Sequence, residues 1–369
     1  MTIERVRVKE RVRRDQMVIC GLLIICTIAA GRINVCSAEP FARPVYLAQI
    51  DAQTVIGHGS QAVIDDLIEG GINTVALQVF PDEGEDGVYW NSSLVPTKRD
   101  LLGMFIDRAH EKNLSVWAWM VTLDMPVVYE SHPEWRVKAY INGRYTEDTG
   151  WYRRVSPFVD DNNEFIKSLY KEIAQRYHVD GFLLQDDLYL SYEEGFDNAS
   201  MRAFEHSFGK KLTGDILQSD SDAAIFCDWK AKQITHLVRD ITAEVKAIDP
   251  RVVVAVNVYP ETVTLEPSND ICNNFNDIAD SADYVAVMAY HKLDPIHPVG
   301  WVGIVTKDAV QKVGSDKVIL KIQGTDWNND HKLKNDEVNL ALSLARENGA
   351  KNLGIYLYNY MMSDYGLKF

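Results

Sequence analysis

Two adjacent carboxylates, Asp186 and Asp187, stand at the end of a β-rich run that begins at Gly181. Hydrolysis of a glycosidic bond generally needs two carboxyl groups across the scissile bond, and one of them is an acid with a raised pKa. A neighbouring carboxylate and partial burial both raise a carboxyl pKa. Alternation along the strand places Asp187 on the side of Gln185, so we expect Asp187 to be the general acid and Asp186 to give electrostatic support. A helix N-cap or a salt bridge is the alternative role for either acid.

Amides, acids and aromatic side chains gather at the C-terminal ends of the β-rich runs, whereas the other ends carry Val, Ile and Ala. Amides and acids hydrogen-bond to sugar hydroxyls, and aromatic rings stack on the apolar face of a pyranose. This pattern predicts a sugar-binding site made of Gln49, Asp51, Gln78, Trp117, Trp119, Gln185, Asn257, Tyr290, Trp327 and Tyr358. The five aromatic members are the expected stacking subsites. For Gln49, Gln78 and Trp117, filling the interior of a barrel is an equally good explanation.

The elements that must position these side chains form a regular series. Eight β-rich runs recur, at Val45–Asp51, Thr74–Phe80, Ser115–Val121, Gly181–Asp187, Val252–Tyr259, Tyr284–His291, Val318–Gln323 and Leu353–Asn359. Helical periodicity marks stretches between them, for example Asp100–Lys112, Asn163–Tyr177, Trp229–Ile248 and Asp336–Asn348. Eight strand–helix units predict a closed (β/α)8 TIM barrel, as a single domain over residues 39–369. An open doubly wound sheet would show a Gly-rich turn after its first strand, and Ile50–Gln53 has no glycine.

Two connections on the C-terminal face of this barrel are long, Val121–Asn162 and Asp187–Asp228. Loops of more than about 12–15 residues are usually functional or disordered. We expect these two to form the walls of a groove, with the aromatic residues Trp135, Trp151, Tyr152, Tyr189 and Tyr192.

The first 38 residues differ in composition from the rest. Six basic residues among the first 14 precede a 14-residue apolar run, Met17–Ala30, and a small-residue stretch ends at Ala38. This order is typical of a secretory signal, and the apolar run is shorter than the roughly 20 residues that a membrane-spanning helix needs. We expect residues 1–38 to direct export, to the periplasm or beyond, with an uncleaved membrane anchor as the alternative.

The charge of the chain argues against a nucleic-acid partner. The formal net charge is −15, whereas a phosphate backbone is bound by clustered Lys and Arg. Residues 1–38 hold seven of the 38 basic and three of the 53 acidic residues, so residues 39–369 carry a net charge of −19. An acidic groove would favour a cationic sugar polymer, and solubility is the simpler explanation of the same charge.

Cysteine and histidine usage gives no sign of a metal site. Three of the five cysteines lie within residues 1–38, and the remaining two, Cys227 and Cys272, fit either one disulfide or two buried thiols. The sequence has no HxH, HExxH or CxxC motif, and no Ser nucleophile elbow or Walker loop. We therefore expect no metal and no other cofactor.

Several motifs match a known family: Y-L-A-Q-I-D at 46–51, L-Q-V-F at 77–80, V-W-A-W-M at 116–120, D-G-F-L-L-Q-D-D at 180–187 and A-V-M-A-Y at 286–290. Together they resemble the C-terminal glycoside hydrolase domain of the PgaB family, the poly-β-1,6-N-acetyl-D-glucosamine N-deacetylases of bacterial biofilm systems (glycoside hydrolase family 153). The resemblance implies a (β/α)8 barrel that cleaves the partly deacetylated polymer. It covers most of residues 45–360 and includes no deacetylase domain, so we do not expect deacetylation.

The resemblance also implies site residues. The family's H-D-D-A stretch, which holds a catalytic Asp, matches Gln185–Leu188, and its second carboxylate, the Glu of M-P-Y-L-E, matches Asp294. Asp294 is thus the implied partner carboxylate. This chain departs from the family twice: Gln185 stands where the family has a His, and Asp294 is one methylene shorter than Glu.

The sequence thus predicts an exported glycoside hydrolase that cleaves partly deacetylated poly-β-1,6-N-acetyl-D-glucosamine within the polymer chain, using paired carboxylates and no cofactor. Two alternatives stay open. One is a hydrolase of another amino-sugar polymer, such as a galactosamine-containing exopolysaccharide. The other is a non-catalytic glycan-binding barrel that acts in exopolysaccharide export.

Overall fold

The computed structural model describes residues 43–81, 87–150, 152–264, 271–293, 296–329 and 331–358. The expected signal segment, residues 1–38, lies outside these ranges, and so do Trp151 and Asp294. The chain divides into two units between Glu39 and Pro40, and every described residue belongs to the second. None of the helices in the described ranges is both long and apolar enough to cross a membrane.

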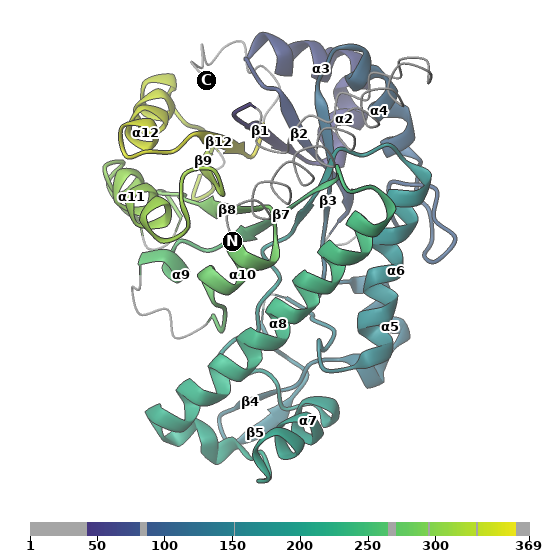
Figure 1. Cartoon of the computed structure of the whole chain (residues 1–369), viewed down its shortest axis with the longest axis vertical. Coiled ribbons are helices and arrows are strands. Elements are labelled where there is room, and N and C mark those ends of the chain that lie inside the picture. The colour runs from purple at the N-terminus through teal and green to yellow at the C-terminus, as the bar shows by residue number, and fades with distance from the viewer. Residues whose placement is uncertain are drawn as a thin grey trace, which may run out of the picture. The chain divides into compact units, whose positions relative to one another are not determined.

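In the described part of the chain, eight parallel strands close into a barrel with the spatial order β1-β12-β9-β8-β7-β6-β3-β2 (Figure 1). The strands are β1 (Tyr46–Ile50), β2 (Thr74–Phe80), β3 (Ser115–Met120), β6 (Gly181–Leu184), β7 (Val253–Val258), β8 (Tyr284–Met288), β9 (Val318–Gln323) and β12 (Asn352–Tyr356). Each predicted run coincides with or overlaps one of these strands. The expected (β/α)8 TIM barrel is therefore confirmed.

The strands are apolar along most of their length because parallel barrel strands are covered on both faces. In β8, which reads Tyr-Val-Ala-Val-Met, all five residues are buried. Alternate side chains separate into two clusters. One fills the barrel interior and includes Leu47 and Ala286, and the other, which includes Ala48 and Val285, packs beneath the helices.

Helices follow most of the strands and surround the barrel (Figure 1). They are α2 (Ala52–His58), α3 (Ser60–Glu69), α4 (Leu101–Glu111), α5 (Pro126–Ser131), α6 (Asp160–Arg176), α7 (Asn198–Phe208), α8 (Asp220–Ile248), α9 (Glu261–Thr264), α10 (Phe275–Ser281), α11 (Trp301–Val313) and α12 (Asn335–Glu347). The long α8 begins at Asp220, nine residues before the expected start at Trp229. Ser219 sets this start, because its hydroxyl accepts a hydrogen bond from Asp222 N and caps the helix.

The two long connections pack on each other rather than standing apart as two walls. Backbone N–H groups of Gly195 and Phe196 donate to Lys138 O at 3.0 and 2.9 Å. The first connection forms the hairpin of β4 (Ala139–Ile141) and β5 (Arg144–Thr146), which lies beside α7 and the N-terminal part of α8 (Figure 1).

A disulfide between Cys227 and Cys272 joins α8 to the segment after β7. Of the two arrangements that the sequence allowed for these cysteines, the structure has the disulfide.

Candidate active site

A cavity of about 260 Å³ opens at the C-terminal mouth of the barrel. Barrel enzymes keep their active sites on this face. Its lining residues are Gln49, Tyr152, Gln185, Asp186, Asn257, Tyr259, Met288, Tyr290, Leu293, Lys321, Trp327 and Tyr356. Within the described ranges, no group of three or more His, Cys, Asp or Glu side chains is arranged to hold a metal ion. The described lining thus has one carboxylate, together with amides, phenols, an indole, a lysine and the apolar Met288 and Leu293.

Asp186 is the acid that reaches this cavity. It is half-buried in the turn after β6, and its Oδ2 accepts a hydrogen bond from the Tyr152 hydroxyl at 3.2 Å. Burial and the charge of Asp186 raise the pKa of Tyr152 and of Tyr259, so both phenols stay protonated. A carboxylate that faces a cavity in this way can exchange a proton with a bound sugar or stabilise positive charge on it.

Asp187 lies behind the cavity, and its side chain is fully buried. Its Oδ2 accepts hydrogen bonds from the backbone N–H groups of Thr122, Leu123 and Asp124 at 2.8, 2.6 and 2.6 Å. Burial raises the pKa of Asp187 to about 6, although the hydrogen bonds from the three backbone N–H groups lower it. The side chain thus ties the loop after β3 to the turn after β6.

The expectation that Asp187 shares the barrel mouth with Gln185 is wrong. β6 ends at Leu184, so the next three residues lie beyond the strand, where side chains no longer alternate. Gln185 and Asp186 both line the cavity, and Asp187 points into the protein. Among the described residues that line this cavity, the carboxylate is therefore Asp186.

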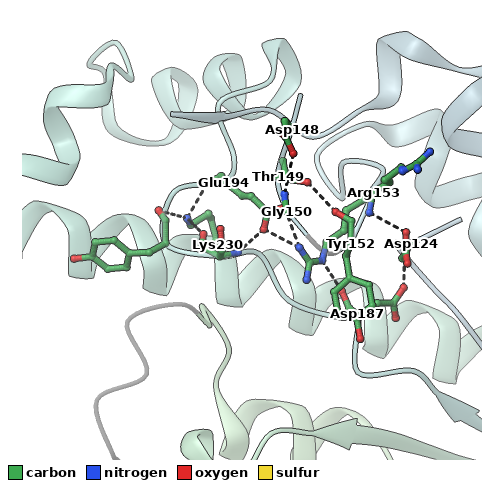
Figure 2. Close-up of polar contacts among 12 residues, drawn as sticks. Asp124, Asp148, Thr149, Gly150, Tyr152, Arg153, Asp187, Glu194 and Lys230 are labelled. Atoms are coloured by element: carbon green, nitrogen blue, oxygen red, sulfur yellow. Dashed lines mark hydrogen bonds and ion pairs between the residues drawn. The ribbon is translucent and has the colours of Figure 1, made fainter. Parts of the chain in front are cut away.

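A buried ionic network holds the turn after β6 in place (Figure 2). Arg154 donates from Nε to Asp187 O at 3.1 Å and from Nη1 to both carboxylate oxygens of Glu194 at 3.0 Å. The Lys230 Nζ donates to three backbone carbonyl oxygens of the 191–194 segment, and burial lowers the pKa of Lys230 to about 7. Removing one partner of a buried ion pair is strongly destabilising. The network therefore fixes both long connections against the turn that carries Asp186.

Lys321, which the sequence analysis did not select, lies fully buried in the middle of β9 and lines the cavity. Its Nζ donates to Gln49 Oε1 and, at 2.7 Å, to Asn257 Oδ1. Gly354 on the neighbouring β12 leaves room for the lysine stem, since a Cβ there would stand 2.8 Å from Lys321 Cγ. Burial lowers the pKa of Lys321 to about 7. A Lys within an apolar β-rich run was the signal available in the sequence, because lysine is rarely buried.

Two of the predicted stacking residues, Trp117 and Trp119, fill the barrel interior. The Trp117 ring packs 6.0 Å from the Tyr284 ring, and the Trp119 indole N–H donates to Gln185 Oε1. Neither lines the cavity. For Trp117 the barrel-filling alternative is therefore the correct one.

Three further predicted residues have structural roles. Asp51 caps α2 by accepting a hydrogen bond from Thr54 N at 2.6 Å, and Gln78 lies nearby with its Oε1 3.4 Å from Ala52 N. The buried Tyr358 hydroxyl donates to the carboxylate of Asp66. None of these three residues lines the cavity, so the structure does not bring them together with the others.

The remaining predicted residues come together as expected at the cavity: Gln49, Gln185, Asn257, Tyr290 and Trp327. Tyr152, expected in a groove wall, also lines it, whereas Trp135, Tyr189 and Tyr192 do not. Tyr259 and Tyr356 also line the cavity; both stand near the ends of predicted strands but were not included in the predicted sugar-binding set. Asp294, the expected partner carboxylate, lies outside the described residues.

A (β/α)8 barrel with a carboxylate among amides and aromatic side chains at its mouth is suited to glycoside hydrolysis, although the same fold also serves many other reactions. Residues 53–356, well over half of the chain, match the family described as hypothetical glycosyl hydrolase family 13. The chain belongs to this family and is a glycoside hydrolase.

Individual relatives agree with this assignment. The chain is 26% identical over 311 residues to the poly-β-1,6-N-acetyl-D-glucosamine N-deacetylase of Escherichia coli K12. This match covers 79% of this chain and 45% of that protein. It is 23% identical over 259 residues to glycosyl hydrolase DigH of E. coli K12, covering 63% of this chain and 53% of that protein. The chain thus spans about half the length of these curated relatives.

Among solved structures, the PgaB (BpsB) glycoside hydrolase domain of Bordetella bronchiseptica matches with a TM-score of 0.76 and 21% identity. The match covers 86% of this chain and 95% of that one. The resemblance to the PgaB glycoside hydrolase domain is therefore confirmed.

Proposed function

We propose that the protein cleaves partly deacetylated poly-β-1,6-N-acetyl-D-glucosamine within the polymer chain, with Asp186 acting at the scissile bond. The observation that carries the proposal is the cavity at the barrel mouth, where Asp186 is the only carboxylate among the described lining residues. The polymer is suggested by the name of the E. coli relative, an N-deacetylase of this glycan. The solved relative from Bordetella, a glycoside hydrolase domain, supports the same chemistry.

The roles follow from position. Asp186 exchanges the proton or stabilises the oxocarbenium-like transition state, and Tyr152 and Tyr259 orient it. Asp294 is the proposed partner carboxylate, because it matches the second carboxylate of the PgaB glycoside hydrolase domain. Asp187, which strand alternation favoured as the acid, has a positioning role instead.

Aromatic side chains give the cavity a surface suited to a pyranose ring. The Tyr290 ring lies 5.4 Å from Trp327 and 5.8 Å from Tyr356, and Trp327 lies 5.7 Å from Tyr356. All three line the cavity. Such a cluster can stack on the apolar face of a sugar while the amides of Gln49 and Asn257 hydrogen-bond to its polar groups.

The test uses purified residues 39–369 and β-1,6-linked polymers of differing deacetylation, with products identified by mass spectrometry. We expect internal cleavage of the partly deacetylated polymer and turnover reduced by about 10² or more in Asp186→Asn, as for the loss of a proton-transferring carboxylate. Asp187→Asn should lose less, because an amide oxygen still accepts the three backbone hydrogen bonds. Asp240→Asn, an exposed position on α8, is the matched control and should not change turnover.

Two results would contradict this assignment. No product from any β-1,6-linked glucosamine polymer would rule out the substrate class. Near-native turnover of Asp186→Asn together with an inactive Asp187→Asn would instead return the catalytic role to Asp187.

A further inference from the structure

A second, smaller cavity adjoins the one that Asp186 lines. Its volume is about 20 Å³. Its described lining shares four residues with the larger cavity: Tyr259, Met288, Tyr290 and Leu293. The two cavities are therefore neighbours at the mouth of the barrel.

This smaller cavity has the size and the polar groups of a site for one water molecule. A cavity needs about 10–15 Å³ to admit a water, and the water needs two to four polar partners. The Tyr290 hydroxyl and Trp301 Nε1 are buried, at 5% and 7% exposure of their residues, and neither makes a hydrogen bond within the described ranges. Both residues line the cavity, and one water oxygen can accept from both donors. Such a water removes the cost of two unpaired buried groups.

Glu261 supplies the acceptor that this water needs. It lines the same cavity and begins α9, which packs on α11, the helix that Trp301 begins. A water that accepts from Trp301 and Tyr290 still has its own O–H groups to donate, and a carboxylate accepts them. The smaller cavity thus combines two donors with one carboxylate around the space for a water.

The position of Glu261 relates it to the reaction. Asp186 follows β6 and Glu261 follows β7, and these strands are neighbours in the barrel. Tyr259 connects the two acids, because it lines both cavities and its hydroxyl interacts with Asp186. In barrel enzymes the catalytic residues come from the ends of several strands. Inverting glycosidases keep their two carboxyl groups far enough apart for a water to lie between them.

We propose that this smaller cavity holds the hydrolytic water and that Glu261 is the general base that activates it. The water oxygen bonds to the anomeric carbon as the glycosidic C–O bond breaks. Glu261 accepts the proton that the water loses, and Asp186 gives a proton to the leaving sugar oxygen. Asp294 then stabilises positive charge on the sugar ring. The inference rests on the proposed function and deepens it, because it predicts inversion at the anomeric carbon.

The stereochemistry of the products tests this mechanism without any variant. Wild-type residues 39–369 are mixed with partly deacetylated β-1,6-linked polymer, and proton NMR records the new reducing ends before they mutarotate. We expect α anomers to appear first, since the β bond is inverted. Products that are first β anomers overturn Glu261 as the base.

Two variants test the carboxylate and one of the donors. Glu261→Gln keeps the size of the side chain and removes its basicity, so kcat should fall by about 10² or more with little change in KM. Trp301→Phe keeps a ring and removes the N–H, so kcat should fall about fivefold. Glu205→Gln, at an exposed position on α7, is the control and should keep the wild-type kcat.

Azide separates the loss of a base from the loss of folding. Glu261→Ala leaves space for azide, which attacks without losing a proton. Azide should therefore raise the kcat of this variant by about tenfold or more and leave an α-glycosyl azide at the cut. Azide should not restore activity to Asp294→Ala, because the charge of Asp294 is not replaced by a nucleophile.

The outcomes separate the inference from the proposed function. Wild-type kcat in Glu261→Gln or Trp301→Phe, or no azide product from Glu261→Ala, overturns the water site and leaves the hydrolase intact. No product of the wild-type protein from any β-1,6-linked glucosamine polymer contradicts the proposed function and this inference with it.

Discussion

Two neighbouring acids of one type, Asp186 and Asp187, have different surroundings and therefore different chemistry. The first lies against two phenols and an open cavity, and the second accepts three backbone hydrogen bonds inside the protein. The two acids differ because β6 ends at Leu184, and residue types alone do not show where the strand ends.

Asn257 and Tyr290 could be predicted as site residues, because they are a polar and an aromatic residue at strand ends. Lys321 could not, because its place in the cavity depends on the space that Gly354 leaves on the neighbouring strand.

The buried carboxyl of Asp187 should make stability depend on pH. Its pKa is about 6 in the folded protein, against an ordinary value of 3.8, so between about pH 4 and 6 the folded state binds more protons than the unfolded state. The free energy of unfolding therefore falls as pH rises through this window, by up to about 3 kcal/mol for a shift of this size. Asp187→Asn does not titrate, so wild type should lose stability relative to this variant between pH 4 and 7.

Urea unfolding of both proteins at pH 4, 5, 6 and 7 measures this difference, and Asp240→Asn serves as the surface control. Stability curves of wild type and Asp187→Asn that run parallel with pH would show that Asp187 has an ordinary pKa.

At the scale of elements, alternation of β-rich and helical stretches was enough to predict all eight strands and the barrel. The errors lie at the ends of elements. β6 is shorter than the predicted run Gly181–Asp187, because a turn begins after Leu184. α8 is longer than the predicted segment Trp229–Ile248, because the Ser219 cap sets its start. The β4–β5 hairpin was missed altogether, since it lies in a connection and packs on the neighbouring connection rather than on the barrel.

The start of β6 offers a test of how tightly the barrel is packed. A Cβ added at Gly181 would stand 2.8 Å from Trp117 Cδ1 and 2.8 Å from the backbone oxygen of Val253. We expect Gly181→Ala to lower the free energy of unfolding by about 1–3 kcal/mol, since overpacking a rigid core forces backbone shifts. Gly57→Ala is the matched control in α2, where no atom lies within 4 Å and alanine should stabilise the helix by about 0.5–1 kcal/mol.

Thermal unfolding distinguishes the two glycine variants by the sign of their Tm shift. A Gly181→Ala protein as stable as wild type would mean that β3 and β7 can move apart at this end of the barrel.

For the whole molecule, we propose that residues 1–38 direct export. The basic and apolar regions of this segment support the proposal, and so does the Cys227–Cys272 disulfide, because disulfides persist mainly in oxidising compartments. The full chain, expressed in a bacterial host, should fractionate outside the cytoplasm, either cleaved or membrane-bound. Residues 39–369 alone should stay in the cytoplasm. Equal cytoplasmic recovery of both forms would contradict a role in export.

The disulfide should also contribute to stability, because it closes a loop of 45 residues between α8 and the segment after β7. The loss of unfolded-state entropy for a loop of this length corresponds to about 4 kcal/mol, and native disulfides typically contribute 2–5 kcal/mol. Reduction of purified residues 39–369 should therefore lower the urea midpoint clearly. The Cys227→Ser/Cys272→Ser double variant should already have the lower midpoint and should not respond to reductant.

A thiol titration of the denatured, unreduced protein is an independent test of the disulfide. Cys227 and Cys272 are the only two cysteines in residues 39–369, so the titration should find no free thiol. Two free thiols, or a midpoint that reductant does not change, would show that the two cysteines are not bonded in the folded protein.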